Sequence, residues 1–405
     1  MTRKDLTLKK FNVDQLTDQQ STQLDQIEKF INHHLQNAKS KHAVGVISGE
    51  AGTGKSVILT KLFKKIQQGR QDTTSPYFRT NNVFTVNHPE LLKVYQELAA
   101  TLPALRKKDY VRPTSLINQA HKQRQKYDVV VIDEGHLLLS KPEPYIKFTQ
   151  QNQLDEIIKL AKVVIVVFDF KQVMQTKMYW DQQLLNQILA PYHTQYFNLT
   201  MQYRMQAPAS VMNWVNALSD GTILPLPSET GRYDLRIYRH AIDMYQQIQD
   251  CDKRMGLSRI VATTGFVRKN QNEHHVYMDD FDLPWDEYDI QPTPWAQRPA
   301  SIHEVGSIYT VQGFDLNYVG VILGPPFEYD AQHDCMIVNP SKVTHTEIYK
   351  KHPDLTHPEK MAWVKQRIMF NVIDVLLKRG IYGLYITAAD EKLRQRLLLA
   401  QDKKQ

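Results

Sequence analysis

The sequence predicts an α/β protein of two domains in tandem, each built on a parallel sheet that helices flank. Its apolar runs, such as "DVVVID" (128–133) and "KVVIVVFD" (162–169), are continuous in Val and Ile rather than alternating. Continuous runs indicate strands that are covered on both faces, which is typical of parallel sheets. Helical patterns separate these runs. Around residues 189–205 the strand–helix pattern begins again, which predicts the second domain.

The expected elements follow in chain order. The polar amino-terminal segment contains a helix, "STQLDQIEKFINHHLQ" (21–36), with one apolar stripe. Strands are expected in the first domain at 43–48, 82–87, 128–133 and 162–169, and in the second at 233–239, 258–265, 305–313, 318–324 and 383–389. The Pro- and Trp-rich stretch 280–301 is expected to be irregular. We place the two domains at residues 1–195 and 196–405.

Composition limits the classes of function. The chain has 405 residues and 50 Lys and Arg against 43 Asp and Glu, a net charge of +7. This charge suits a nucleic-acid partner, although many basic proteins have none. Cys251 and Cys335 are far apart in the sequence and predict neither a disulfide nor a metal site. The amino-terminus lacks a signal-peptide pattern, and the aliphatic runs are too short to span a bilayer. We therefore expect a cytoplasmic protein without a membrane partner.

A phosphate-binding pattern follows the first expected strand. The segment "GEAGTGKS" fits the P-loop spacing, with an apolar strand before it and an amphipathic helix after it. In such a loop the backbone N–H groups and the helix N-terminus converge on phosphate oxygens. Lys55 is expected to reach the outer phosphates, and Ser56 to bind Mg²⁺. The expected nucleotide-binding residues here are Gly49, Glu50, Ala51, Gly52, Thr53, Gly54, Lys55 and Ser56.

Two adjacent carboxylates end the run "VVVID", in the motif "DEGH" (133–136). Asp133 suits the role of a magnesium ligand, and Glu134 that of the base that activates a water. The metal ion and Lys55 would compensate the two like charges. An acid after a strand can also bind a ribose in dinucleotide enzymes, but there it lies about 20 residues after a Gly-rich loop of a different pattern. His136 is expected to link this motif to the segment after the next strand, or else to pack at a helix start.

With these motifs placed, the chain resembles a superfamily 1 helicase or translocase, most of all the Schlafen-type (group 3-like) DNA/RNA helicase domain family of bacteria. The resemblance covers nearly the whole chain. It rests on "LTDQQ" (16–20), "FDFKQ" (168–172), "LTMQYRM" (199–205), "IYTVQGFDLNYVGVI" (308–322) and "NVIDVLLKRGIYGLYI" (371–386). The residues that it implicates are Gln20 as adenine reader, Gln172 as phosphate sensor, Arg204 and Arg379 as arginine fingers, and Gln312 and Gly313 as nucleotide contacts.

The resemblance implies two RecA-like domains with ATP and Mg²⁺ at their interface. It implies an ATPase that acts as a helicase or single-strand translocase on DNA or RNA, with single strands favoured. A partner protein would supply any nuclease step, since the sequence has no nuclease motif. Three residues depart from the family pattern, Phe168, Asp315 and Lys378, and two of them, Phe168 and Lys378, favour an alternative function. In that alternative ATP binding gates a nucleic-acid-binding switch that controls a partner, with little or no unwinding.

Nucleic-acid contacts are less determined by the sequence. Asn87 and His88 follow the second expected strand, where a backbone contact is plausible, but Asn87 as a helix cap is the favoured interpretation. The segment "TSLINQ" (114–119) has the same two interpretations. Trp285 and Trp295 could stack on bases, but we favour their anchoring of an irregular loop. The pair His274–His275 lacks the second pair that a zinc site needs.

Overall fold

The structure is a computed structural model that describes residues 16–37, 42–49, 52–173, 175–176, 179–199, 204–268, 274–279, 281–286, 293–311, 314–349 and 356–402. The chain divides into two compact units. The amino-terminal unit comprises residues 8–173 and 177–202, and the carboxy-terminal unit comprises residues 203–405 together with 174–176. The boundary expected after residue 195 falls inside strand β6 (His193–Leu199), which pairs with β1 (Ala43–Gly49).

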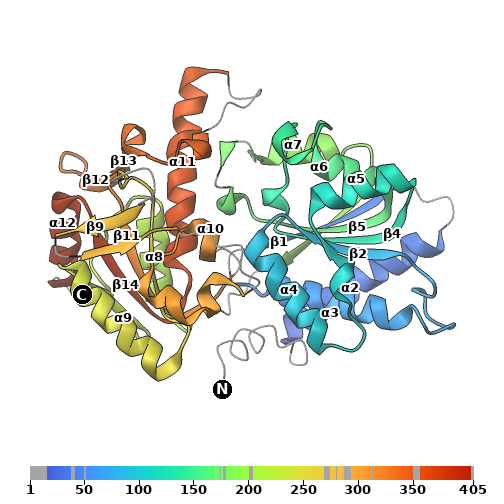
Figure 1. Ribbon diagram of the computed structural model, residues 1–405, viewed down its shortest axis with the longest axis horizontal. Coiled ribbons are helices and arrows are strands. Elements are labelled where there is room, and N and C mark those ends of the chain that lie inside the picture. The colour runs from blue at the N-terminus through green and yellow to red at the C-terminus, as the bar shows by residue number, and fades with distance from the viewer. Residues whose placement is uncertain are drawn as a thin grey trace. The chain divides into compact units, whose positions relative to one another are not determined.

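The amino-terminal unit has one parallel sheet of six strands in the order β3-β2-β4-β5-β1-β6 (Figure 1). Besides β1 and β6 these are β2 (Asn82–Val86), β3 (Tyr110–Val111), β4 (Tyr127–Asp133) and β5 (Ala161–Phe168). The four strands expected in this region are confirmed. The sequence pattern missed β3, which has two residues, and β6, which is largely exposed at the sheet edge and lacks a continuous apolar run.

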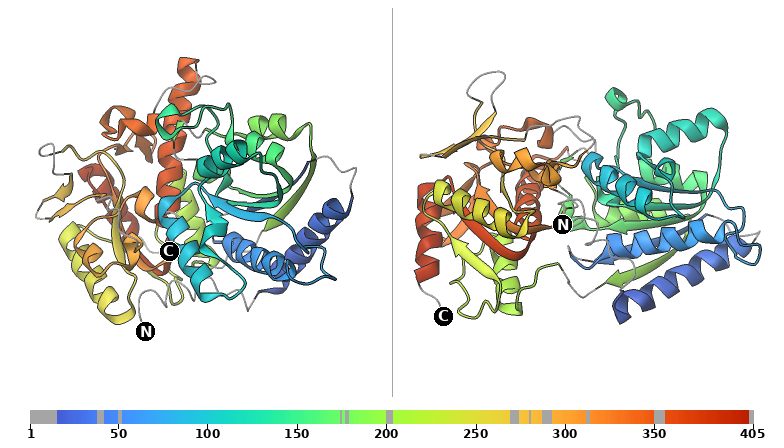
Figure 2. Two further views of the ribbon diagram at one scale, coloured as in Figure 1. Left: turned by 45° about the vertical axis from the view of Figure 1, so that its right-hand side comes forward. Right: turned by 60° about the horizontal axis from the view of Figure 1, so that its bottom comes forward.

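Helices cover both faces of this sheet (Figures 1 and 2). Side chains of β5 alternate between two apolar clusters, Val163, Ile165 and Val167 in one and Val164 and Val166 in the other. The first cluster includes side chains of α2 (Asp18–Gln36), α3 (Lys55–Gly69) and α4 (Pro89–Thr101). The second includes side chains of α5 (Pro113–Gln123), α6 (Gln153–Leu160) and α7 (Gln182–Leu189). Burial on both faces explains the continuous Val and Ile runs.

The carboxy-terminal unit has a second parallel sheet, in the order β7-β14-β11-β8. Its strands are β7 (Asp234–Ile237), β8 (Arg259–Ala262), β11 (Leu316–Leu323) and β14 (Gly380–Ala388). Two antiparallel hairpins are added, β9 (His275–Met278) with β10 (Phe281–Pro284) and β12 (Phe327–Asp330) with β13 (Cys335–Val338). The helices are α8 (Ala209–Ser219), α9 (Ala241–Met255), α10 (Ile308–Val311), α11 (Pro358–Leu377) and α12 (Glu391–Asp402).

The strand expected at 305–313 is wrong, because the one-turn helix α10 occupies this segment. Gly306 still bridges the edge strand β8, where its N–H donates to the Ile260 carbonyl. The chain then turns at Ser307, whose N–H donates to Thr310 Oγ1 at 2.8 Å, while its carbonyl accepts from the Thr310 N–H. These local side-chain bonds offer the backbone an alternative to the sheet and outweigh the apolar alternation.

Two parallel α/β units in tandem confirm the fold class that the sequence predicted, a P-loop architecture with RecA-like domains. In both units the strands are parallel within the main sheet, so their carboxyl ends share one edge. Ligands of open α/β sheets bind beyond this edge. None of the helices in the described part of the chain has the length and apolar character needed to cross a membrane.

Candidate nucleotide-binding site

The loop between β1 and α3 has the backbone of a phosphate cradle. Gly52 and Gly54 have φ of 88° and 81°, in the left-handed region that only glycine adopts without strain. Gly49 has no room for a side chain either, since a Cβ there would lie 2.7 Å from the Leu199 carbonyl oxygen. Thr53 is buried. Glu50 and Ala51 lie outside the described residues. Glycine therefore stands at each described loop position whose backbone angle or close contact excludes a side chain.

Lys55, the first residue of α3, is turned onto its own loop. Its Nζ donates to the Gly49 carbonyl at 2.6 Å and lies 3.6 Å from Asp169 Oδ2. Gln172 Nε2 donates to the same Asp169 oxygen at 2.7 Å. Burial raises the pKa of Asp169, but the charges of Lys55 and His136 and the hydrogen bonds from Gln172 and the Lys171 N–H outweigh it, so the pKa lies below its usual value. Asp169 is therefore a buried anion that balances the P-loop lysine.

Asp133 ends β4 and is almost completely buried, with 1% of its surface exposed. Ser56 Oγ donates to its Oδ2 at 2.9 Å, and the Glu134 N–H donates to its Oδ1 at 2.9 Å. The hydroxyl of Tyr95, on α4, donates to Oδ2 at 2.5 Å. Burial, followed by the charge of Glu134, raises the pKa of Asp133 to about 6, while the three hydrogen bonds act in the opposite direction. The two expected magnesium ligands are thus in direct contact.

Glu134 starts the 3₁₀ turn Gly135–Leu137 with φ 52° and ψ 51°. A left-handed conformation is uncommon for a residue with a side chain and often marks a functional position. Its Oε2 lies 3.1 Å from Nε2 of His136, which is fully buried. Gly135 is required here, because a Cβ would lie 2.5 Å from the Val167 carbonyl oxygen. The charge of His136, in the "DEGH" motif, also lowers the pKa of Asp169, which follows β5.

Gln20 lies over the P-loop in the first turn of α2. It forms a capping box with Thr17, in which the Gln20 N–H donates to Thr17 Oγ1 and the Thr17 N–H donates to Gln20 Oε1. Its Nε2 lies 3.5 Å from the Thr53 carbonyl oxygen. The structure therefore brings Gln20, Thr53 and Gly54 together, although Gln20 is far from the loop in the sequence.

The donor set fits a magnesium ion bound together with phosphates. Ser56 and Asp133 offer a hydroxyl and a carboxylate oxygen, which are hard ligands of the kind Mg²⁺ prefers. Among the residues that the structure describes, no group of three or more His, Cys, Asp and Glu side chains could hold a metal. Mg²⁺ sites of the nucleotide type use one or two protein ligands and take the rest from phosphates and water.

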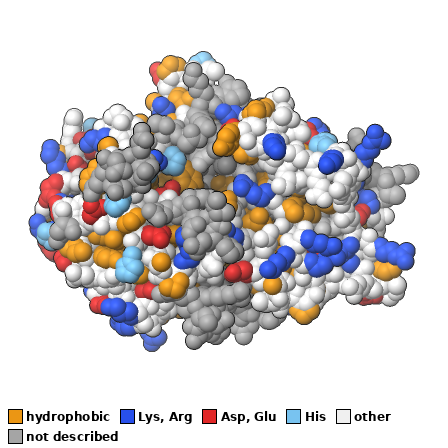
Figure 3. All heavy atoms as spheres, viewed as in Figure 1, with side chains coloured by type: hydrophobic (Ala, Val, Ile, Leu, Met, Phe, Trp, Pro, Cys, Tyr) orange, Lys and Arg blue, Asp and Glu red, His pale blue; other side chains and the backbone are white. Residues whose placement is uncertain are grey.

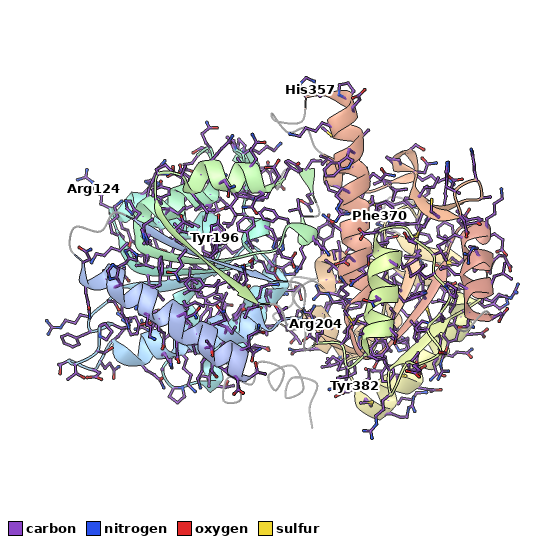
Figure 4. The ribbon with its side chains drawn as sticks, turned by 180° about the vertical axis from the view of Figure 1, so that it is seen from behind. Arg124, Tyr196, Arg204, His357, Phe370 and Tyr382 are labelled. Atoms are coloured by element: carbon purple, nitrogen blue, oxygen red, sulfur yellow. The ribbon has the colours of Figure 1, made fainter. Side chains whose placement is uncertain are left out.

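In the carboxy-terminal unit, Arg204 precedes α8 (Figure 4). Its Nε forms an ion pair with Asp315 Oδ1, and both side chains are mostly buried. Asp315 directly precedes β11. Arg204 is thus held by a carboxylate of its own unit.

Arg379 lies between α11 and β14 and is 1% exposed. Its Nε donates to the Val375 carbonyl at 3.1 Å and its Nη1 to the Phe314 carbonyl at 3.0 Å. Both bonds fix backbone of the carboxy-terminal unit, so Arg379 would have to exchange them to touch a phosphate. Gln312 and Gly313, the other residues expected to contact the nucleotide, lie outside the described residues.

Residues 42–390 match the family described as Schlafen group 3, DNA/RNA helicase domain. The match covers most of the chain. The chain belongs to this family. A relative in Saccharomyces cerevisiae, the uncharacterized protein YPL245W, is 37% identical over 414 residues, which cover 95% of this chain and 90% of that protein. The Schlafen-type helicase family expected from the motifs is confirmed. Its restriction to bacteria is not confirmed, because this relative is a yeast protein.

Two solved structures are similar at a low level. The crystal structure of Pif1 helicase from Candida albicans has 11% identity and a TM-score of 0.38, with 95% of this chain and 96% of that chain covered. Mss116p bound to ssRNA and AMP-PNP has 12% identity and a TM-score of 0.40, with 100% and 78% covered. These similarities are too low to assign a role to the Schlafen group 3 chain.

The expected cap of α4 in this Schlafen group 3 protein requires a correction. The N-cap is His88, whose Nδ1 accepts from the Leu91 N–H at 3.2 Å. Asn87 instead bridges two loops, since its Nδ2 donates to the Leu137 carbonyl at 2.7 Å and its Oδ1 accepts from Arg112. The residue before the cap is buried and polar, so its side chain satisfies neighbouring loops rather than the helix end.

The tryptophans of the irregular stretch are anchors. Trp285 and Trp295 are 3% and 1% exposed, and Trp295 Nε1 donates to Glu304 at 2.7 Å. Buried indoles are not available to stack on bases, so the favoured interpretation is confirmed.

Among the basic side chains, Lys378 is buried, in an ion pair with Asp374 at 2.5 Å. Exposed Lys and Arg side chains lie in several groups on the face of the amino-terminal unit shown in Figure 3, and Lys107 and Lys108 are among the exposed residues of this unit.

The sequence patterns did not indicate two residues of the site. Asp169 stands in the motif "FDFKQ" but was not expected to pair with Lys55. Tyr95 lies in a helix whose apolar spacing marks it as core, and only the fold brings its hydroxyl to Asp133. A tyrosine at a core-facing position of α4 was the one indication in the sequence, because the hydroxyl of a buried Tyr usually has a hydrogen-bond partner.

Proposed function

We propose that this chain is an ATP-dependent motor stimulated by nucleic acid, a helicase or single-strand translocase, which hydrolyses ATP where its two units meet. The observation that carries the proposal is the contact of Ser56 with Asp133, beside Lys55 and Glu134, at the carboxyl edge of the amino-terminal sheet. Membership of a DNA/RNA helicase domain family supports the nucleic-acid part. The proposal includes a cytoplasmic location and single-stranded DNA or RNA as the partner.

In this proposal the residues of the amino-terminal unit bind and position ATP. Lys55 leaves the Gly49 carbonyl and Asp169 for the outer phosphates, which offer a stronger charge partner. Asp169 keeps the hydrogen bond from Gln172, whose amide would sense the terminal phosphate. Glu134 accepts a proton from the attacking water. Mg²⁺, held by Ser56 and Asp133, would neutralise phosphate charge when bound. Gln20, Gln312 and Gly313 are the proposed contacts to the rest of the nucleotide.

The carboxy-terminal unit would supply positive charge to the phosphate in transfer. Arg204 is the proposed main finger, and Arg379 the second. Because Arg204 pairs with Asp315 and Arg379 with backbone carbonyls, each must exchange partners to act. The same observation favours the second candidate, an ATP-gated nucleic-acid-binding switch with little unwinding that controls a partner protein. Steady ATP-driven displacement of a labelled strand separates the two, since a switch would not produce it.

The test of the proposed function is ATPase activity across a panel of single- and double-stranded DNA and RNA. We expect hydrolysis that rises with at least one single-stranded polynucleotide. Glu134→Gln should lower kcat by about 10²-fold or more, because the base is lost, while binding of a fluorescent ATP analogue persists. Glu143→Gln, in the same connecting segment, is the matched control and should behave as wild type. Normal turnover by Glu134→Gln would refute the base assignment, and no stimulation by any polynucleotide would refute the motor.

A further inference from the structure

Tyr95 occupies an unusual position for a residue of the hydrophobic core. It is fully buried on α4, within an aromatic group in which its ring centroid lies 4.5 Å from that of Phe84 and 5.8 Å from that of Tyr110. Its hydroxyl nevertheless donates to Asp133 Oδ2 at 2.5 Å. Together with Ser56 and the Glu134 N–H, it engages both oxygens of the carboxylate.

We propose that Tyr95 is a positioning residue of the magnesium site, which holds the Asp133 carboxylate in the orientation that binds the ion. The inference rests on the proposed function, because it concerns the metal that accompanies ATP. A carboxylate that binds a metal is commonly fixed by hydrogen bonds from outer residues, and the loss of one such partner typically costs 10–100-fold in metal affinity or activity. Ser56 cannot take this part, because its hydroxyl is itself an expected ligand.

Burial alone does not explain the contact. In the same aromatic group Tyr110 is buried, and its hydroxyl makes no hydrogen bond in the described part of the chain. The chain therefore tolerates an unbonded tyrosine hydroxyl at this depth, and phenylalanine would serve the packing at position 95 equally well.

The rigidity of the donor is part of the inference. The Tyr95 ring is held between neighbours, so its hydroxyl cannot follow the carboxylate if Asp133 rotates. A fixed donor restricts the carboxylate without replacing a ligand, which lowers the entropy lost when the ion binds. Without the hydroxyl, Asp133 keeps Ser56 and the Glu134 N–H as donors, and Ser56 is the one that must turn toward the ion. We therefore expect the metal-dependent part of nucleotide binding to weaken.

The experiment compares Tyr95→Phe with Tyr110→Phe in the full chain. Each removes one hydroxyl from the same aromatic group, and only the first removes a bond to Asp133. The affinity for a fluorescent ATP analogue is measured with Mg²⁺ and with EDTA. We expect the gain in affinity from Mg²⁺ to fall about 10-fold or more in Tyr95→Phe, with the affinity in EDTA unchanged. Tyr110→Phe should keep the full gain. The Mg²⁺ concentration for half-maximal ATPase rate should rise in parallel.

The outcomes separate this inference from the proposed function. A wild-type chain that does not bind the analogue refutes the nucleotide site, and one that binds it equally with and without Mg²⁺ refutes the magnesium site on which this inference rests. A wild-type chain with a normal Mg²⁺ gain that Tyr95→Phe retains overturns the positioning role alone. A loss of affinity in EDTA as well as in Mg²⁺ would also overturn it, because a general packing defect would then be the cause. Thermal unfolding of both variants shows whether either change disturbs the fold.

Discussion

The two units hold their candidate site residues in different ways. In the amino-terminal unit the expected residues contact one another. Ser56 donates a hydrogen bond to Asp133, and Glu134 Oε2 lies 3.1 Å from His136 Nε2. In the carboxy-terminal unit Arg204 pairs with Asp315, and Arg379 donates to main-chain carbonyls. The amino-terminal part of the site is assembled within one unit. The arginines of the other unit are each occupied locally.

This difference gives the two units different expected roles. Preformed contacts favour binding, because little has to be reordered when the nucleotide enters, apart from Lys55, which must leave Asp169 and the Gly49 carbonyl. Locally held arginines favour control, because each has to exchange a partner before it stabilises charge on a phosphate. To reach a phosphate, Arg204 would replace one carboxylate partner with phosphate oxygens. Arg379 would have to give up two buried carbonyl groups, which would then lack a hydrogen-bond donor. We therefore expect Arg204 to move more readily than Arg379.

The largest expected effect is that of Arg204→Ala on hydrolysis. An arginine finger contributes about 10³-fold or more to kcat in phosphoryl transfer. We expect a loss of about this size, with affinity for a fluorescent ATP analogue within 10-fold of wild type. Measurement of kcat and analogue binding in the same preparation checks this. Arg232→Ala, which removes an exposed arginine of the same unit, is the control and should retain activity. Unchanged turnover in Arg204→Ala would remove Arg204 from the transition state.

A smaller effect, on stability, is expected from Arg379→Ala. The buried guanidinium donates to the carbonyls of Val375 and Phe314, and hydrogen bonds to charged groups contribute about 1.5–3 kcal/mol each. We expect the free energy of unfolding to fall by about 3 kcal/mol or more, as measured by denaturant titration. Arg204→Ala should cost less, because its ion-pair partner can turn to water. Equal stability losses in the two variants would break the proposed contrast between a mobile and a fixed arginine.

The sequence predicted the parts of the site that depend on local pattern. The P-loop glycines and the acids after β4 are encoded within a few residues, and continuous Val and Ile runs placed the main strands correctly. Tyr95 could not be predicted, because its contact with Asp133 joins residues 38 positions apart through packing. The same holds for Asp169, which pairs with Lys55 because the neighbouring strands β5 and β1 end at the same edge of the sheet. Strand β6 was missed because an exposed edge strand has no apolar run, and the 305–313 strand was wrong because Ser307 bonds locally.

The smallest expected effect concerns two buried carboxylates, one in each unit. Asp169 lies beside Lys55, and its pKa is lowered. Asp286 accepts a hydrogen bond from the Ser307 hydroxyl, and burial raises its pKa to about 6 in spite of that bond. Folding therefore favours protonated Asp286. Its contribution to stability is present below the ordinary pKa near 4 and is lost as the pH rises through about 6.

Asp286→Asn tests this contrast, because the amide is neutral at every pH and asparagine tolerates the φ of 55° at this position. Its oxygen can still accept from Ser307. Relative to wild type, the variant should gain on the order of 2–3 kcal/mol between pH 4 and pH 7. Unfolding of the carboxy-terminal unit, followed by calorimetry across this range, measures the gain. If the free energy of unfolding changes with pH in the same way in the variant and in wild type, Asp286 is charged in the folded protein at little cost. The proposed difference between the buried acids of the two units would then be wrong.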